Sequence, residues 1–178
     1  MIRLFVGLRP PAAIRAQLLA LMGGIPGARW QDDGQLHITL RFIGEVDERA
    51  AEDAALALSA VRWPPLEVAL EGVGTFDSRG RINALWAGVR PKDGLAALHR
   101  KIDQALVRAG QPPERRAYLP HITLARMNTP SEALANFVEA HAGLASPLFT
   151  LEHFYLFESH LGHEAARYEA VARYPLKI

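Results

Sequence analysis

The most informative absence in this sequence is cysteine. None of the 178 residues is a cysteine, which excludes disulfides, thiolate nucleophiles and zinc or iron–sulfur centres held by thiolates. No window approaches the ~20 apolar residues that a membrane-spanning helix needs. Arg9, Pro10 and Arg15 interrupt the apolar N-terminus before a signal peptide forms. We therefore expect a soluble, cytoplasmic protein without a membrane partner.

A strong charge of either sign is also missing. The formal net charge is +1, so the chain lacks the global basic field that drives non-specific nucleic-acid binding. Any anionic ligand must then be held by a local site. Hydrophobic residues make up 49% and charged residues 22% of the chain, which is typical of a soluble globular domain rather than a disordered chain.

What the sequence does contain is one tetrapeptide twice. "HITL" occupies residues 37–40 within "GQLHITLRF" and residues 121–124 within "YLPHITLAR", although the chain has only seven histidines. A single His-x-Thr is best explained as a structural histidine, because such tripeptides are common. Two identical tetrapeptides in equivalent surroundings favour a functional site instead.

The order of elements around the two motifs repeats as well. Hydrophobic spacing predicts a strand, a helix, the HITL strand, a helix and a strand in each half of the chain. Short links beside the HITL strands favour mixed, mainly antiparallel sheets. We predict an α+β fold with one domain over 1–178, made of two similar lobes with sequence halves of roughly 1–78 and 79–178. A pseudo-two-fold would relate the lobes, with helices outside and a central cleft.

The boundaries of these elements follow from turn and capping residues. In the second half, Thr129 is predicted as the N-cap of a helix and Pro130 as its first residue. The predicted helices are 10–24, 44–61, 92–110 and 128–144, and the predicted strands are 1–8, 34–42, 65–76, 81–89, 118–126, 148–159 and 166–176.

Alternation along a strand gives the two motifs a common chemistry. His37 projects with Thr39, and His121 with Thr123, while the isoleucine and leucine of each motif face the other way. If the two faces meet across the cleft, two imidazoles and two hydroxyls surround one point, which suits a phosphate. One histidine can then act as general base and the other as general acid. The hydroxyls can bond the phosphoryl oxygens without a metal.

A second group of histidines superficially suggests a metal site. His153, His160 and His163 lie close in sequence to Glu158 and Glu164. Their spacing matches no recognised ligand pattern. We therefore expect neither a metal nor another cofactor.

The doubled motif resembles the hallmark of the 2H phosphoesterases, and more narrowly their LigT-like branch, the RNA 2',3'-cyclic phosphodiesterases. The resemblance is carried by "RLFVGL", "LHITLRFIGEV", "LWAGV", "LPHITLAR" and "LFESHL". It implies a bilobal fold and metal-independent hydrolysis of a 2',3'-cyclic phosphate to a 2'-phosphate. The partners would be RNA ends or short oligonucleotides, and we expect a monomer. The reverse 2'-5' RNA ligation and a non-catalytic nucleotide-binding module stay open as alternatives.

The resemblance also implies roles for the motif residues. His37 would be the proton donor to the departing O3', and His121 would be the general base that activates water. Thr39 and Thr123 would hold the phosphoryl oxygens.

The family resemblance and strand alternation point to different arginines as the phosphate ligand. The resemblance points to Arg126, which matches a family arginine. Strict alternation instead places Arg41 with His37 and leaves Arg126 out of phase, unless the strand ends or bulges near Ala125. We favour Arg126 and keep Arg41 as a weaker candidate.

Other residues near the motifs could contact RNA. Tyr118, Trp30 and Phe42 could stack a terminal base, although alternation turns Phe42 toward the core. Arg115 and Arg116 could follow an RNA backbone, with a solvated surface as the alternative.

Overall fold

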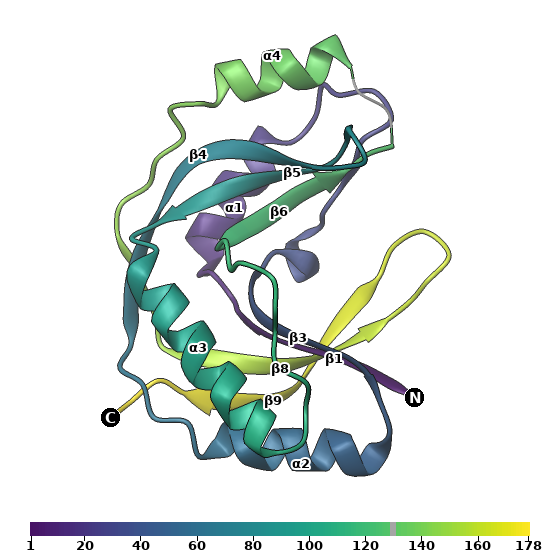
Figure 1. The fold of residues 1–178 in the computed structure, drawn as a ribbon. Coiled ribbons are helices and arrows are strands. Elements are labelled where there is room, and N and C mark those ends of the chain that lie inside the picture. Colours follow the sequence, from purple (N-terminus) through teal and green to yellow (C-terminus); the bar gives the residue numbers. More distant parts are fainter. Residues whose placement is uncertain (129–130) are drawn as a thin grey trace.

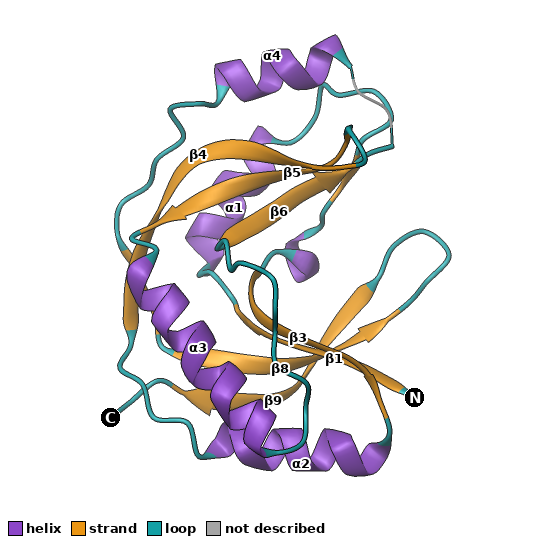
Figure 2. Ribbon diagram, in the orientation of Figure 1, coloured by secondary structure: helices purple, strands orange, loops and turns teal. Residues whose placement is uncertain are grey.

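The computed structural model of the chain describes residues 1–128 and 131–178, and the predicted element order recurs in both halves (Figure 1). Figure 2 distinguishes the helices, which lie on the outside, from the strands. The elements are β1 (Ile2–Leu8), α1 (Ala12–Leu21), β2 (Arg29–Trp30), the short 3-10 helix η1 (Asp33–Gln35), β3 (Ile38–Val46), α2 (Glu48–Ser59), β4 (Leu66–Ser78), β5 (Arg81–Arg90), α3 (Asp93–Arg108), β6 (His121–Arg126), α4 (Glu132–Ala140), β7 (Phe149–Leu151), β8 (His153–His160) and β9 (Arg167–Pro175).

The strands follow the order β7-β4-β5-β6-β3-β1-β8-β9, and β2 also pairs with β6. Neighbouring strands are antiparallel, which confirms the predicted α+β class. We call β7, β4, β5, β6 and β2 the β6 group, and β3, β1, β8 and β9 the β3 group; Figure 1 shows them as two layers. At the β3–β6 seam, Ile38 pairs with Ile122. The isoleucines of the two HITL motifs therefore join the groups, and this brings both motifs to one seam.

The strand groups do not follow the sequence halves 1–78 and 79–178. That boundary lies inside the β4–β5 hairpin, where Ser78 pairs with Arg81 across Arg79 and Gly80. Both turn residues have positive φ, 54° and 78°, as a two-residue hairpin turn requires. The turn holds β4 beside β5, whereas β8 pairs with β1 toward the other end of the sheet. The first half thus gives β4 to the group that contains the second motif, and the second half gives β8 and β9 to the group that contains the first motif.

The helices begin where polar caps allow. Asp47 caps α2, as predicted, by accepting a hydrogen bond from the backbone of Ala50. Ser131 caps α4 in the same way, whereas the predicted cap Thr129 and the predicted first residue Pro130 lie outside the described residues. Within the described residues, no helix is long and apolar enough to cross a membrane.

Helix α3 is the element that supports the motif strand β3. Apolar residues at helical spacing bury one face of it, as the sequence predicts, and the helix contacts α2 and β3. Its buried residues are Leu95, Leu98, Ile102 and Leu106.

Candidate active site

The two strand groups enclose a cleft of about 740 Å³ that both motifs line. Its walls come from β1, β3 and β9 on one side and from β4, β5 and β6 on the other. The cleft brings together all the site residues predicted from the motifs and from the resemblance except Arg41. They are His37, Thr39, His121, Thr123 and Arg126.

Each motif strand carries a β-bulge at the leucine of HITL. In β3 the register along β1 skips Leu40, and in β6 the register along β5 skips Leu124. One extra residue reverses the alternation of side chains beyond it. The residues two positions after these leucines, Phe42 and Arg126, therefore face the cleft. The bulge that Arg126 requires is present, one residue before Ala125.

The bulge at Leu40 in β3 corrects the prediction for Arg41. Strict alternation would place Arg41 beside His37, but it lies on the opposite face of β3 and is 6% exposed. Its Nε donates to Oδ1 of Asp103 at 2.8 Å, and its guanidinium also donates to the carbonyls of Phe42 and Pro112. Arg41 is thus committed to a buried ion pair rather than to the cleft. Phe42, predicted to face the core, is 49% exposed.

Both motif histidines are oriented by the same backbone hydrogen bond. Nδ1 of His37 lies 2.7 Å from the carbonyl oxygen of Gln35, and Nδ1 of His121 lies 2.8 Å from that of Leu119. A carbonyl oxygen can only accept, so Nδ1 carries the proton and Nε2 is the nitrogen that remains for proton transfer. Nε2 of His37 lies 2.9 Å from Oγ1 of Thr39. In the first motif, histidine and threonine are therefore coupled.

The cleft disfavours positive charge on both imidazoles. Burial lowers the pKa of His37 from 6.5 to about 4, and burial also lowers the pKa of His121. The backbone hydrogen bonds oppose this effect, whereas the charge of Arg126 adds to it at both histidines. Near pH 7 both rings are neutral in the unliganded protein. An anion bound beside them would act in the opposite direction and favour protonation.

Aromatic rings from neighbouring strands pack against each imidazole. The ring of Phe5 lies 4.8 Å from that of His37, and Tyr168 meets His37 edge-on at 5.2 Å. Phe76 meets His121 edge-on at 4.7 Å. These contacts restrict the orientation of the two imidazoles. Tyr168 and Phe76 could not be predicted from the sequence, because only the sheet order brings their strands next to the motifs.

Arginines give the cleft a positive wall although the whole chain has a net charge of only +1. Arg3, Arg116 and Arg126 line it together with Glu45. Guanidinium groups bind phosphate oxygens through charge-assisted hydrogen bonds. The cleft therefore matches a ligand with a phosphate.

A group that could hold a metal ion lies elsewhere in the described residues. Glu158, His160 and Glu169 bring their ligand atoms within 4.8 Å of one another on β8 and β9. Nε2 of His160 is 3.0 Å from a carboxylate oxygen of Glu169, so an ion pair forms when His160 is protonated. None of these three residues lines the cleft between the motifs. His153 and His163, noted in the sequence, do not belong to this group.

Comparison with known proteins agrees with the geometry. Residues 10–163 match the 2'-5' RNA ligase superfamily. The chain is 30% identical over 154 residues to the RNA 2',3'-cyclic phosphodiesterase of Geobacillus stearothermophilus, covering 85% of this chain and 49% of that protein. It thus spans about half the length of that relative. A protein of the same name from Methanocaldococcus jannaschii is 26% identical over 173 residues, covering 95% of this chain and 98% of that one.

A solved structure shares the fold over almost the whole chain. The structure of E. coli LigT complexed with 3'-AMP superimposes with a TM-score of 0.80 at 27% identity, and covers 98% of each chain. The family match spans more than half of the chain, and it includes both HITL motifs. The chain therefore belongs to the 2'-5' RNA ligase superfamily.

Proposed function

We propose that this protein hydrolyses 2',3'-cyclic phosphates, on RNA ends or on nucleotides, and leaves a 2'-phosphate. The observation that carries the proposal is the pair of His-x-Thr motifs on one cleft, each histidine held by the same Nδ1 bond to a backbone carbonyl. Two relatives in the same family carry the name RNA 2',3'-cyclic phosphodiesterase. A pure binding module needs anion donors but not two imidazoles oriented by the same bond at Nδ1.

In the proposed step, a water molecule attacks phosphorus and the bond from phosphorus to O3' breaks. His121 accepts the proton of the water at Nε2, and His37 gives a proton from Nε2 to the departing O3'. Thr39, Thr123 and Arg126 bind the non-bridging oxygens, where negative charge accumulates. Each positioned proton transfer contributes ~10²–10⁴-fold. The balance of atoms and protons closes without a metal.

The donor role requires that substrate binding protonates His37. The pKa of His37 is about 4 in the unliganded protein because the ring is buried. The negative charge of a bound phosphodiester beside Nε2, together with its neutralisation of Arg126, raises that pKa. The reverse assignment, with His121 as donor, needs the same help, because burial lowers the pKa of His121 as well. The two assignments can be distinguished with a substrate whose leaving group departs without a proton, because only the variant of the proton donor regains activity on it.

The first test measures hydrolysis of adenosine 2',3'-cyclic phosphate in the presence of a chelator. We expect His37→Gln and His121→Gln each to lower kcat by at least ~100-fold, with metal removal leaving the wild type unchanged. The matched control is His163→Gln, which changes an exposed histidine outside the cleft. Near-wild-type turnover in either motif variant would reject the paired mechanism. Loss of activity in chelator would reject metal independence.

The second test assigns the two roles. A cyclic substrate with sulfur in place of O3' releases a thiolate, which leaves without a proton. If His37 is the donor, His37→Gln recovers most of its activity on this substrate while His121→Gln does not. Recovery in the His121 variant instead would reverse the assignment.

A second candidate activity is RNA ligation, which the family name itself suggests. A 5'-hydroxyl in place of water would attack the same phosphorus, and the departing O3' would leave a 2'-5' linkage. The same base and acid serve both reactions. Incubation of RNA with a labelled cyclic-phosphate end and a 5'-hydroxyl partner separates the two, because ligation lengthens the labelled strand and hydrolysis does not.

A further inference from the structure

A buried glutamine lies just before the first motif and outside the lining of the cleft. Gln35 is 7% exposed and precedes His37 by two residues. Gln35 and Arg41 are the polar side chains buried to this degree within the described residues. Arg41 has Asp103 as its partner. A buried amide is normally held by hydrogen bonds, so the partners of Gln35 show what its side chain does.

The side-chain amide of Gln35 joins two segments that are far apart in the sequence. Its Oε1 accepts from the backbone nitrogen of Asp32 at 2.9 Å, and its Nε2 donates to the carbonyl of Ala166 at 2.7 Å. A backbone N–H can only donate and a carbonyl can only accept, so these two partners give the amide one orientation. Asp32 precedes η1, and Ala166 directly precedes β9. Gln35 thus ties the entrance of the first motif to the β8–β9 hairpin.

The backbone carbonyl of Gln35 is the group that orients His37. Nδ1 of His37 donates to it at 2.7 Å. Gln35 is the last residue of η1, and the last carbonyls of a helix have no partner within the helix. This carbonyl is therefore free to accept from the imidazole. A short 3-10 helix has poor hydrogen-bond geometry of its own, so the direction of the carbonyl depends on what holds the turn.

Side chains at both ends of η1 hold this turn. Oδ1 of Asp32 accepts from the backbone nitrogen of Gln35 at 3.0 Å, while Gln35 accepts from the backbone nitrogen of Asp32. The reciprocal pair is a capping box. Nε of Arg15 lies 2.9 Å from a carboxylate oxygen of Asp33, which joins the turn to α1. The bond to Ala166 adds what the cap cannot supply, because it sets the position of the turn relative to the hairpin.

The hairpin that Gln35 reaches is also part of the wall around His37. Ala166 and Tyr168 both line the cleft, and the ring of Tyr168 meets the imidazole edge-on at 5.2 Å. Strand β9 and η1 are in contact. The amide of Gln35 therefore links two supports of the imidazole, the carbonyl that accepts from Nδ1 and the aromatic ring beside it.

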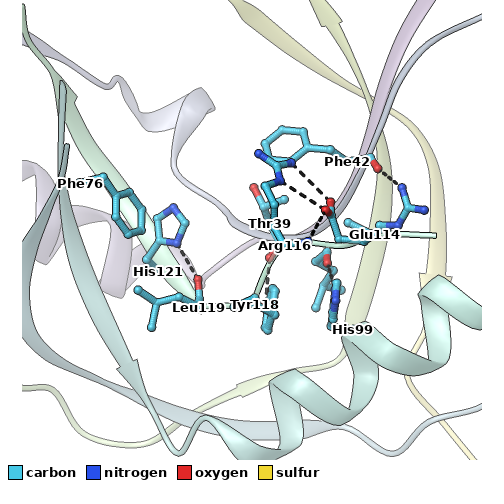
Figure 3. Close-up of a pocket in the computed structure, with 12 residues that line it drawn as sticks. Thr39, Phe42, Phe76, His99, Glu114, Arg116, Tyr118, Leu119 and His121 are labelled. Carbon is cyan, nitrogen blue, oxygen red and sulfur yellow. Dashed lines mark hydrogen bonds and ion pairs between the residues drawn. The ribbon is translucent and has the colours of Figure 1, made fainter. Parts of the chain in front are cut away.

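The second motif is held by a different side chain, as Figure 3 shows. Nδ1 of His121 donates to the carbonyl of Leu119. Tyr118, one residue earlier, donates through its hydroxyl to the carbonyl of Thr39 at 2.8 Å. That bond ties the second motif to β3, whereas Gln35 ties the first motif to the β8–β9 hairpin. Each motif is thus anchored to a distant segment by one side chain just before its histidine.

We propose that Gln35 is a positioning residue for His37. Its amide keeps the η1 carbonyl and the hairpin in one arrangement, so that the imidazole retains its proton on Nδ1 and presents Nε2 to the cleft. Proton transfer requires a group held within hydrogen-bond reach of the reacting atom. The inference rests on the proposed function, because it concerns the proton transfer by His37. Gln35 is not among the described residues that line the cleft, so it acts through His37.

The test replaces Gln35 by methionine, which keeps the length of the side chain but has no N–H to donate. With adenosine 2',3'-cyclic phosphate, we expect Gln35→Met to lower kcat about 10- to 100-fold, the range found for residues that orient functional histidines in metal sites. KM should change by less than about threefold, because the side chain does not contact the substrate. Gln35→Asn keeps an amide that is one methylene too short to bridge Asp32 and Ala166, and should lower kcat as well.

Gln17 provides a matched control. Its Nε2 donates at 2.8 Å to the carbonyl of Ala145, so Gln17→Met removes the same kind of long-range bond at a position outside the cleft lining. This variant should keep the kcat and KM of the wild type. Urea unfolding of the three variants establishes that each is folded under the conditions of the assay.

Nitrogen chemical shifts of the His37 ring, measured by NMR, test the proposal without turnover. A ring nitrogen that carries a proton resonates apart from one that does not, so the spectrum of the neutral ring gives the ratio of the two tautomers. The wild type and Gln17→Met should show the Nδ1–H form alone. Gln35→Met should show a mixture that includes the Nε2–H form.

The proposal can fail separately from the proposed function. Wild-type kcat in Gln35→Met would overturn it and leave the phosphodiesterase proposal intact. A lower kcat with an unchanged His37 ring would also overturn it, because Gln35 would then act by another route. If even the wild type hydrolyses no cyclic phosphate, the proposed function fails, and the tautomer ratio alone decides the positioning role. A wild-type ring in the Nε2–H form would reject that role without any variant.

Discussion

Lowering the pH below neutrality will destabilise this protein, and His37 is the residue that we expect to contribute most. Its pKa is 6.5 as an unperturbed group and about 4 in the folded protein, because burial disfavours the charged ring. Between these two values the unfolded chain binds a proton that the folded chain does not. The free energy of unfolding therefore falls as the pH falls through this window.

The size of the effect follows from the two pKa values. Integrating the linkage relation for one group with pKa 6.5 unfolded and about 4 folded gives about 2.5 kcal/mol between pH 7.5 and pH 4.5. Nearly all of it accumulates below pH 6.5. This is a large share of the ~5–15 kcal/mol that stabilises a typical domain.

Urea unfolding at a series of pH values measures this contribution. The stability of wild type minus that of His37→Gln should fall by about 2.5 kcal/mol from pH 7.5 to pH 4.5, because glutamine does not titrate while its amide can still donate to the Gln35 carbonyl. His163→Gln, at an exposed position, is the matched control. NMR titration of the His37 ring reports the pKa directly.

A difference that stays constant across the pH range would refute this reasoning, as would a His37 ring that titrates near 6.5. Addition of phosphate provides a second check. If the anion binds beside Nε2, the pKa of His37 rises and the acid destabilisation becomes smaller. No change with phosphate at saturating concentration would contradict its placement in the cleft.

Three further changes probe the supports of the site. Arg41→Met leaves the carboxylate of Asp103 without its buried partner and should cost about 3 kcal/mol in urea unfolding, whereas Arg41→Met combined with Asp103→Leu should cost less. Tyr118→Phe removes the hydroxyl that donates at 2.8 Å to the carbonyl of the first motif threonine; it should cost about 1 kcal/mol and lower kcat more than it raises KM. Gly88→Ala brings a Cβ against the backbone oxygen of Glu71 in β4 and should cost about 1–3 kcal/mol. Gly143→Ala meets open space and should change the free energy of unfolding by less than about 0.5 kcal/mol.

Much of the local structure could be predicted from the sequence. Apolar spacing located the buried face of α3, and the aspartate before α2 is its cap as expected. The repeated motif identified the four cleft residues His37, Thr39, His121 and Thr123. The helix face and the cap are confirmed, because helical periodicity and capping depend on residues close together in the chain.

The arginines and Phe42 show where local patterns fail. Alternation predicts which face of a sheet a strand residue occupies only where each residue pairs with one residue of the neighbouring strand. The bulges at Leu40 and Leu124 are properties of the pairing with β1 and β5. They exchange the faces of Arg41 and Phe42, and they bring Arg126 back to the cleft.

By itself, the sequence predicted the four α-helices, the order of the longer strands and the chemical groups that the two motifs carry, but not β2, η1 or the division of 148–159 into β7 and β8. The tertiary structure decided that β4 and β8 each join the group opposite their own half, that Ile38 meets Ile122 at the seam, and which aromatic rings enclose the two imidazoles. Strand pairing depends on contacts between residues far apart in the chain. The faces of the strand residues and the depressed histidine pKa values arise from those contacts, so neither could be read from residue spacing alone.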